Sequence, residues 1–185
     1  MAPMDFDDPV ALSRSLEGAT TLFNTYWIRF SRGEATHERA AENSRTLIRA
    51  AADAGVRRIV HISITGASSN SHLSYFRCKG EGEEAVIGSR MSHAIIRPAL
   101  VFGREDVLAN NIAWALRRFP VFPMFGSGDY PVQPVFVEDL AKIAVAAARE
   151  TRDMAIDAVG PETLTFEELV RLIGDKAGNP ARLSM

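Results

Sequence analysis

Three short apolar runs, each followed by a stretch with helical spacing, constrain the fold of this chain more than any other feature. They cover residues 20–26, 57–63 and 92–97 and are rich in aliphatic and aromatic side chains. Between the first two runs lies a helical pattern, and Gly55 stands where that helix should end. Strands that alternate with helices favour crossover connections between parallel strands over hairpins. The sequence therefore predicts an α/β protein with a parallel sheet.

Capping and chain-breaking residues mark the other expected elements. Asp7 or Asp8 is the expected N-cap of a short first helix, with Pro9 at its first position. Gly80 and Gly82 lie inside the third expected helix, where each costs about 1 kcal/mol relative to alanine. Glycines at such a cost indicate close backbone packing. We expect a first helix that begins at Pro9 and is closed by Gly18, and further helices over residues 34–54, 75–89, 105–119, 137–150 and 165–177. A fourth strand is expected over 155–159 and an irregular segment over 120–134.

Composition narrows the function classes. The 185 residues are 46% hydrophobic and 24% charged, with a net charge of -2, as in an ordinary soluble domain. The basic residues are scattered, which argues against nucleic acid as a partner. Cys78 is the single cysteine and the histidines lack metal-ligand spacing, so we expect no metal. No run approaches the length of a membrane span, and the acidic N-terminus is unlike a targeting peptide. We therefore expect no membrane span and a cytoplasmic location.

A tyrosine and a lysine four residues apart carry the clearest chemical signal. Tyr75 and Lys79 share one face of the expected third helix, directly after a loop of small residues at 65–71. A lysine beside a tyrosine favours the phenolate, which lowers the pKa of the phenol and suits it to proton transfer with a carbonyl or alcohol. The competing interpretation is an ordinary pair on a helix surface.

The glycine-rich turn of a dinucleotide-binding sheet is missing from the sequence. Such a turn normally joins the first strand to a helix, so that backbone amides reach the pyrophosphate. The nearest match begins at Gly126-Ser127-Gly128, late in the chain, and has Pro131 where the last glycine belongs. We interpret it as a loop.

Six segments, occurring in one order, carry a resemblance to a known family. They are residues 5–9, 42–44, the Tyr-x-x-x-Lys pair with the following Gly82-Glu83, the Arg-Pro-Ala-Leu-Val-Phe-Gly-Arg-Glu-Asp stretch at 97–106, and residues 133–141 and 165–169. With these segments the chain resembles the extended and atypical branch of the short-chain dehydrogenase/reductase superfamily. That branch includes NmrA-like proteins, NAD-dependent epimerase/dehydratases and the NAD(P)H-binding accessory subunit of respiratory complex I.

The resemblance implies catalytic roles for five residues. Tyr75 would be the general acid/base, and Lys79 would lower its pKa and hold the nicotinamide ribose of the cofactor. Thr65 or Ser63 would polarise the substrate carbonyl, although a simple alignment puts the family's serine near Ile64. Asn43 would order a water that relays protons.

The resemblance also implies a cofactor site for NADP or NAD. Lys79 and the residues Pro98, Ala99, Leu100 and Val101 would lie beside the nicotinamide end, and Asp5 would border the adenine. Asn24 and Thr25 end the first run, where a nicotinamide contact and a simple polar strand end are equally good interpretations. We expect weak dinucleotide binding, because the pyrophosphate cradle is not in this sequence.

These implications predict a Rossmann-like, doubly wound parallel sheet that is N-terminally truncated relative to the family and carries a small C-terminal substrate lobe. The expected division is a partial NAD(P)-binding domain over residues 1–119 and an interleaved lobe over 120–185. The strand near Thr20 would present an unpaired edge, so a homo-oligomer through it is expected.

Two functions remain open at this point. One is an oxidoreductase or epimerase acting on a small carbonyl or sugar-like substrate with Tyr75 and Lys79. The alternative is a non-catalytic protein, either a dinucleotide sensor of the NmrA type or a complex-assembly subunit. A decayed fragment without function is a third reading.

Overall fold

The computed structural model describes residues 4–124, 126–180 and 182–184. The chain divides into two compact units, one formed by the chain up to Pro98 together with Lys142–Asp157, the other by Ala99–Ala141 together with the chain from Ala158. Each unit is described by itself.

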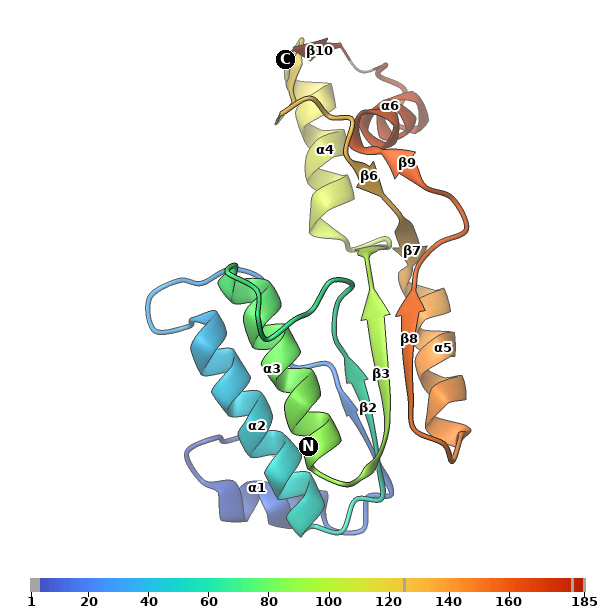
Figure 1. The fold of residues 1–185 in the computed structure, drawn as a ribbon. Coiled ribbons are helices and arrows are strands. Elements are labelled where there is room, and N and C mark those ends of the chain that lie inside the picture. Colours follow the sequence, from blue (N-terminus) through green and yellow to red (C-terminus); the bar gives the residue numbers. More distant parts are fainter. Residues whose placement is uncertain (1–3, 125, 181, 185) are drawn as a thin grey trace. The chain divides into compact units, whose positions relative to one another are not determined.

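The first unit is built on a four-stranded sheet in the order β1-β2-β3-β8 (Figure 1). Its strands are β1 (Thr21–Asn24), β2 (Arg58–Ile62), β3 (Ser92–Pro98) and β8 (Met154–Ala158). β1 pairs parallel with β2, and β2 with β3. This arrangement confirms the predicted parallel α/β sheet, although β3 continues through Pro98 instead of ending before it.

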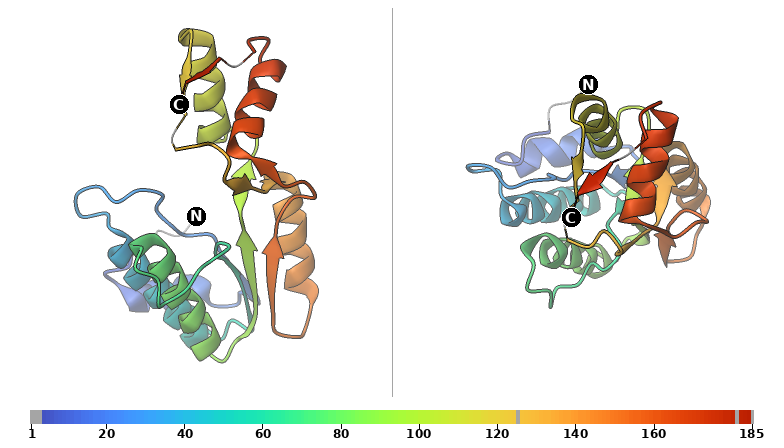
Figure 2. Two further views of the ribbon diagram at one scale, coloured as in Figure 1. Left: turned by 45° about the horizontal axis from the view of Figure 1, so that its top comes forward. Right: turned by 90° about the horizontal axis from the view of Figure 1, so that it is seen from above.

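Helices cover both faces of this sheet, as the doubly wound prediction requires. They are α1 (Pro9–Leu16), α2 (His37–Asp53), α3 (Ser74–Gly88) and α5 (Val137–Arg149), of which α5 enters from the second unit. The first three lie together on one side, and the part of α5 in this unit lies on the other (Figures 1 and 2). The core between helices and sheet is aliphatic, with Ile48, Ile59 and Ile95 at its centre.

Local signals explain where these helices begin. Asp8 caps α1 by accepting from the backbone N–H of Ala11, with Pro9 at the first position, as predicted. α2 begins three residues later than expected, because the side chain of Thr36 accepts from the N–H of Arg39 and so becomes the N-cap. Gly55 ends this helix region with a positive φ of 78°.

One buried arginine connects segments of the first unit that are far apart in the sequence. Arg58 on β2 is 5% exposed. Its guanidinium donates to the backbone carbonyl of Ala147 at 2.9 Å, to that of Arg152 at 3.2 Å and to the hydroxyl of Ser92. These hydrogen bonds hold the segment before β8 against β2, an inner strand of the sheet.

The second unit consists of short strand pairs and two helices. Its helices are α4 (Val107–Arg118) and α6 (Phe166–Lys176), and its strands are β4 (Leu100–Phe102), β5 (Phe122–Pro123), β6 (Pro131–Val132), β7 (Pro134–Phe136), β9 (Leu164–Thr165) and β10 (Leu183–Ser184). β4 pairs parallel with β7, β10 parallel with β5, and β6 antiparallel with β9. The segment expected to be irregular, 120–134, thus contains two short strands, β5 and β6, and the first residue of β7. Its Gly126–Gly128 turn is confirmed by positive φ angles at both glycines.

Candidate functional site

The first turns of α3 bring Tyr75 and Lys79 to the carboxyl end of β2. Lys79 is 4% exposed, and its ammonium Nζ donates to the carbonyl of Ile62, the last residue of that strand, at 3.0 Å. The same ammonium lies 4.3 Å from the centroid of the Trp27 ring, a cation–π contact. Tyr75 is half-buried next to it on the helix. Lys79 is therefore inside the protein and Tyr75 is partly covered, so the pair is not an exposed one on a helix surface.

The charges at this pair differ from the expectation. Burial lowers the pKa of Lys79 to about 8, against the opposing effect of the Glu83 carboxylate. Burial raises the pKa of Tyr75, and the charge that opposes this is the guanidinium of Arg29, not the ammonium of Lys79. In this conformation the lysine does not lower the pKa of the phenol.

The rings of Trp27 and His37 lie against the pair. The ring of Tyr75 meets His37 edge-on with centroids 5.2 Å apart, and Trp27 edge-on at 6.0 Å. Trp27 and His37 are stacked at 6.2 Å. His37 also contacts the Ser74 hydroxyl through Nδ1 at 3.1 Å. Two ring nitrogens here, Trp27 Nε1 and His37 Nε2, are buried and have no hydrogen-bond partner among the described residues.

The two candidates for the carbonyl-polarising hydroxyl have different surroundings. Ser63 is 1% exposed and donates its hydroxyl hydrogen to Oε1 of Glu83. Glu83 in turn accepts from Arg97 through both oxygens, at 2.9 Å and 2.6 Å. Thr65 is partly exposed, its N–H donates to the carbonyl of Pro98, and its hydroxyl has no hydrogen bond within the described residues. Of these two candidates, only Thr65 has a hydroxyl hydrogen that is not already used in a hydrogen bond to a described residue.

Asn24, at the end of β1, is part of a buried polar network. Its Oδ1 accepts from the N–H of Tyr26, which fixes the orientation of the amide. Its Nδ2 then donates to the Ser44 hydroxyl at 3.2 Å and to Nδ1 of His61 at 3.0 Å. His61 Nδ1 must accept, so Nε2 carries the hydrogen, and it has no partner among the described residues. Burial, with the Lys79 charge adding to it, lowers the pKa of His61 to about 3.

The other predicted residues are placed as follows. Asn43 on α2 donates to the hydroxyl of Tyr26 at 2.9 Å. Thr25 is exposed just after β1, and Asp5 is exposed and accepts from the N–H of Asp7. Pro98 ends β3 in the first unit, whereas Ala99, Leu100 and Val101 belong to the second unit. The first unit thus gathers Tyr75, Lys79, Ser63, Thr65, Asn24 and Asn43 around the carboxyl ends of β1 and β2.

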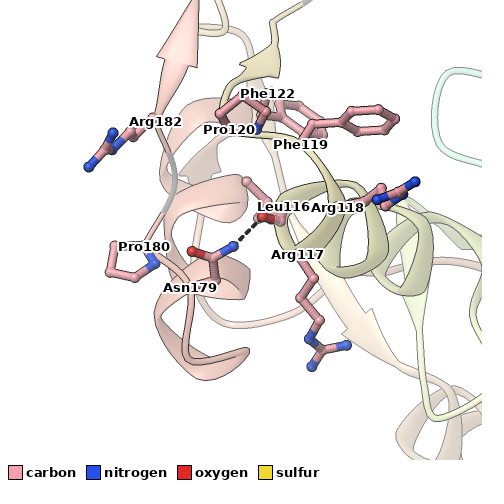
Figure 3. Close-up of a pocket in the computed structure, with 9 residues that line it drawn as sticks. All are labelled: Leu116, Arg117, Arg118, Phe119, Pro120, Phe122, Asn179, Pro180 and Arg182. Carbon is pink, nitrogen blue, oxygen red and sulfur yellow. Dashed lines mark hydrogen bonds between the residues drawn. The ribbon is translucent and has the colours of Figure 1, made fainter.

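A separate cavity lies in the second unit, at the end of α4. It has a volume of about 290 Å³ and is lined by Leu116, Arg117, Arg118, Phe119, Pro120, Phe122, Asn179, Pro180 and Arg182 (Figure 3). Asn179 donates to the backbone carbonyl of Leu116 across it. The arginine side chains point in different directions (Figure 3). None of the residues predicted from the sequence lines this cavity, so we do not assign the function to it.

Sequence reasoning missed three residues of the site. Glu83 is part of the Gly82-Glu83 motif, and its place four residues after Lys79, on the same helix face, was the available signal. Trp27 lies in a connection without periodicity and His37 at the start of the helix that follows, so nothing in the sequence placed them against α3. Within the described residues no cluster of potential metal ligands occurs, and no helix has the length and apolar character needed to cross a bilayer.

The fold is that of the NAD-dependent sugar-nucleotide epimerases and dehydratases, in agreement with the predicted superfamily. A UDP-N-acetylglucosamine 4-epimerase from Bacillus cereus superposes with a TM-score of 0.81 over 100% of this chain and 71% of that chain, at 17% identity. A dTDP-glucose 4,6-dehydratase from Streptomyces venezuelae, with NAD and DAU bound, gives 0.78 over 97% of this chain and 65% of that one, at 21% identity. No family model matches the sequence.

In sequence, the chain is similar to complex I subunits of the same atypical branch. The mitochondrial NADH dehydrogenase [ubiquinone] 1 alpha subcomplex subunit 9 is 32% identical in Arabidopsis thaliana, over 65% of this chain, and 38% identical in Mus musculus, over 66%. An NAD(P)H azoreductase from Xenophilus azovorans is 30% identical over 74% of this chain and 46% of that protein. The chain spans about a third of the length of the complex I subunits it matches.

Proposed function

We propose that this chain binds NAD or NADP and that Tyr75 and Lys79 form the acid/base pair of an oxidoreductase or epimerase. The observation that carries the proposal is the position of Lys79. Its ammonium lies at the carboxyl end of a parallel strand, next to a half-buried phenol on the same helix. That edge of an open α/β sheet is where nucleotide ligands bind.

The residues present fit one end of a dinucleotide. A buried ammonium is a suitable donor to ribose hydroxyls, and Trp27 Nε1 and His37 Nε2 are polar nitrogens without a hydrogen-bond partner in the described part of the chain. The sequence does not supply the glycine-rich turn for the pyrophosphate. We therefore propose that Lys79, with Asn24 and Thr25 nearby at the end of β1, holds the nicotinamide side, and that binding to this chain alone is weak.

In this proposal the protein residues divide the proton chemistry among them. The cofactor, when bound, accepts or supplies the hydride. Tyr75 exchanges a proton with the substrate oxygen, and Thr65 donates a hydrogen bond to that oxygen. The hydroxyl of Thr65 makes no hydrogen bond to any described residue, whereas that of Ser63 is held by Glu83. Asn43 is held by Tyr26 and relays protons only if that contact opens. The substrate class is a small carbonyl or sugar-like molecule.

The proposal is tested by binding and by turnover. Calorimetry with NAD⁺, NADH, NADP⁺ and NADPH should give dissociation constants weaker than micromolar. Hydride transfer to a panel of aldehydes, ketones and nucleotide sugars, followed at 340 nm, should fall at least a hundredfold in Tyr75→Phe, the range expected for loss of general acid catalysis. Thr65→Ala should lower turnover where Thr65→Ser keeps it. Absence of binding by any dinucleotide would refute the proposal.

A second candidate function is a dinucleotide-binding subunit without catalysis. The buried hydrogen bond from Ser63 to Glu83 favours it, since a committed serine cannot donate to a substrate carbonyl. The similarity to complex I subunits favours an assembly role and hence a protein partner. Because those relatives are named as mitochondrial, that compartment is a candidate beside the cytoplasm. Dinucleotide binding with no turnover in the same assays would decide for this candidate.

A further inference from the structure

The connection between β1 and α2 covers the candidate site. We call residues 25–36 the cover segment. Near its start, the Tyr26 hydroxyl accepts from Asn43 and the ring of Trp27 lies over the ammonium of Lys79. Asn43 and Lys79 are two of the residues to which the proposed function gives roles. The cover segment therefore engages both of them at once.

Lys79 is closed off by this arrangement. Of its three N–H donors, one is used by the carbonyl of Ile62, and the indole face of Trp27 blocks another approach with its centroid at 4.3 Å. A ligand hydroxyl needs to come within about 3 Å of Nζ to accept a hydrogen bond. Lys79 is only 4% exposed, so no such approach is open while Trp27 stays in place.

The cover segment is held mainly at its two ends. At the first end Tyr26 and Trp27 make the contacts just described; at the second, Thr36 caps α2. The residues between, from 29 to 35, are exposed, and their contacts include the Arg32–Ala35 bridge and a hydrogen bond from the N–H of His37 to the hydroxyl of Ser31. Segments with so few buried contacts open at a low cost in free energy.

The closed arrangement also leaves polar groups unsatisfied. Trp27 Nε1 and His37 Nε2 are buried without a partner in the described residues, a penalty that is removed when either nitrogen reaches water or a ligand. The cation–π contact favours closure and these two nitrogens favour opening. The two contributions therefore act in opposite directions on the position of the Trp27 ring.

We propose that Trp27 is the gate of this site: its ring must leave the ammonium of Lys79 before Lys79 can donate to a bound dinucleotide. The proposal rests on the proposed function for the identity of the ligand, but the gate itself is a property of the free chain. Binding then carries the cost of breaking the Trp27–Lys79 contact, which lowers the apparent affinity.

The gate can be tested without any ligand. Lysine acetylation by a pulse of acetic anhydride at pH 9, read by mass spectrometry of peptides, measures access to Nζ. Lys176 is exposed on α6 and serves as the internal reference. In Trp27→Ala we expect the Lys79 labelling rate, relative to Lys176, to rise at least fivefold. Trp114→Ala, which removes an indole that is 60% exposed on α4, should leave that ratio unchanged.

Two further measurements separate the possible failures. If circular dichroism shows that Trp27→Ala is unfolded, Trp27→Phe replaces it, with an expected rise of two- to threefold because phenylalanine makes a weaker cation–π contact. An unchanged ratio in a folded Trp27 variant overturns the gate. Calorimetry with NAD⁺ and NADP⁺ should show about tenfold tighter binding to Trp27→Ala than to wild type. Faster labelling with no binding by any variant would support the gate and refute the proposed function.

Discussion

Ser63 donates its hydroxyl hydrogen to the carboxylate of Glu83, which lies 20 residues further along the chain. Both side chains are almost fully buried, and the same carboxylate accepts a bidentate pair of hydrogen bonds from Arg97. Glu83 therefore joins the strand β2, through the residue that follows it, to the strand β3. Both oxygens of this buried carboxylate thus have donors, which offsets the cost of burying it.

Glu83→Gln should destabilise the chain by about 2–3 kcal/mol, because the Arg97 guanidinium loses its counter-charge in a mostly buried site. The expected loss is below that of a fully buried pair, since the Arg97 side chain is 33% exposed. Urea unfolding followed by circular dichroism measures it. Glu167→Gln is the matched control: it breaks the exposed pair with Arg171 and should cost no more than about 0.5 kcal/mol. Equal losses in the two variants would contradict the prediction.

His61 should make stability depend on pH in acid. Its pKa is lowered from 6.5 to about 3 by burial and by the Lys79 charge, so the folded chain keeps the imidazole neutral while the unfolded chain binds a proton near pH 6.5. The unfolded state thus binds more protons below pH 6.5, and stability is lost as the pH falls toward 3. The expected loss from this residue between pH 7 and pH 4 is about 3 kcal/mol.

Comparison of wild type with His61→Gln separates the contribution of His61 to the pH dependence of stability from that of the carboxylates, because the carboxylates are the same in both chains. Unfolding free energies at pH 7, 5.5 and 4 should show a smaller decline in the variant. His72→Gln, in the exposed loop before α3, should decline as wild type does. A His61→Gln chain that follows the wild-type slope would show that the histidine is protonated when folded.

Gly80→Ala should destabilise the chain although alanine is the better helix former. A Cβ at this position would lie 2.3 Å from the backbone nitrogen of Ser69 and 2.4 Å from the carbonyl carbon of Ser68, so α3 would have to move away from the loop. We expect a loss of about 2 kcal/mol or more. Gly88→Ala, where nothing lies within 4 Å, should instead be neutral or gain up to about 1 kcal/mol. Thermal unfolding of both variants tests the contrast.

The isolated chain should self-associate through β1. In the part of the chain that the structure describes, β1 is the end strand of its sheet and has only β2 as a neighbour, and Phe23 on it is 45% exposed. An apolar strand edge pairs readily with another copy. Sedimentation velocity at tens of micromolar should show oligomers for wild type and mainly monomer for Phe23→Lys. A monomeric wild type would contradict this prediction.

Local signals in the sequence were sufficient for the regular elements. The cap of α1 is Asp8, one of the two predicted candidates, and the expected helix from 165 begins with a capping box of Thr165 and Glu168; both caps depend on residues within three positions of each other. The close packing inferred from Gly80 is also confirmed, because its backbone meets that of the loop before α3. Short-range chemistry of this kind can be read from the order of residues.

The partners of the site residues were not predictable in the same way. That Trp27 lies on Lys79 depends on the path of a connection without periodicity, and that Ser63 lies on Glu83 depends on the packing of α3 against β2. The direction in which the pKa of Tyr75 shifts was not predictable for the same reason. Sequence spacing predicts a neighbouring lysine but not where its ammonium lies. The short strands at 120–134 were missed because two or three residues carry no alternation.

Arg58 has a consequence for the synthesis of the protein. The carbonyls that it binds belong to Ala147 and Arg152, 89 and 94 residues later in the chain. During translation the first three strands leave the ribosome long before these acceptors exist, and the guanidinium stays without them until the segment of β8 emerges. We therefore expect a ribosome-stalled nascent chain that exposes residues only up to 130 to be cleaved rapidly by protease, and one that exposes β8 to resist. The four-stranded sheet can therefore be completed only after β8 has been synthesised.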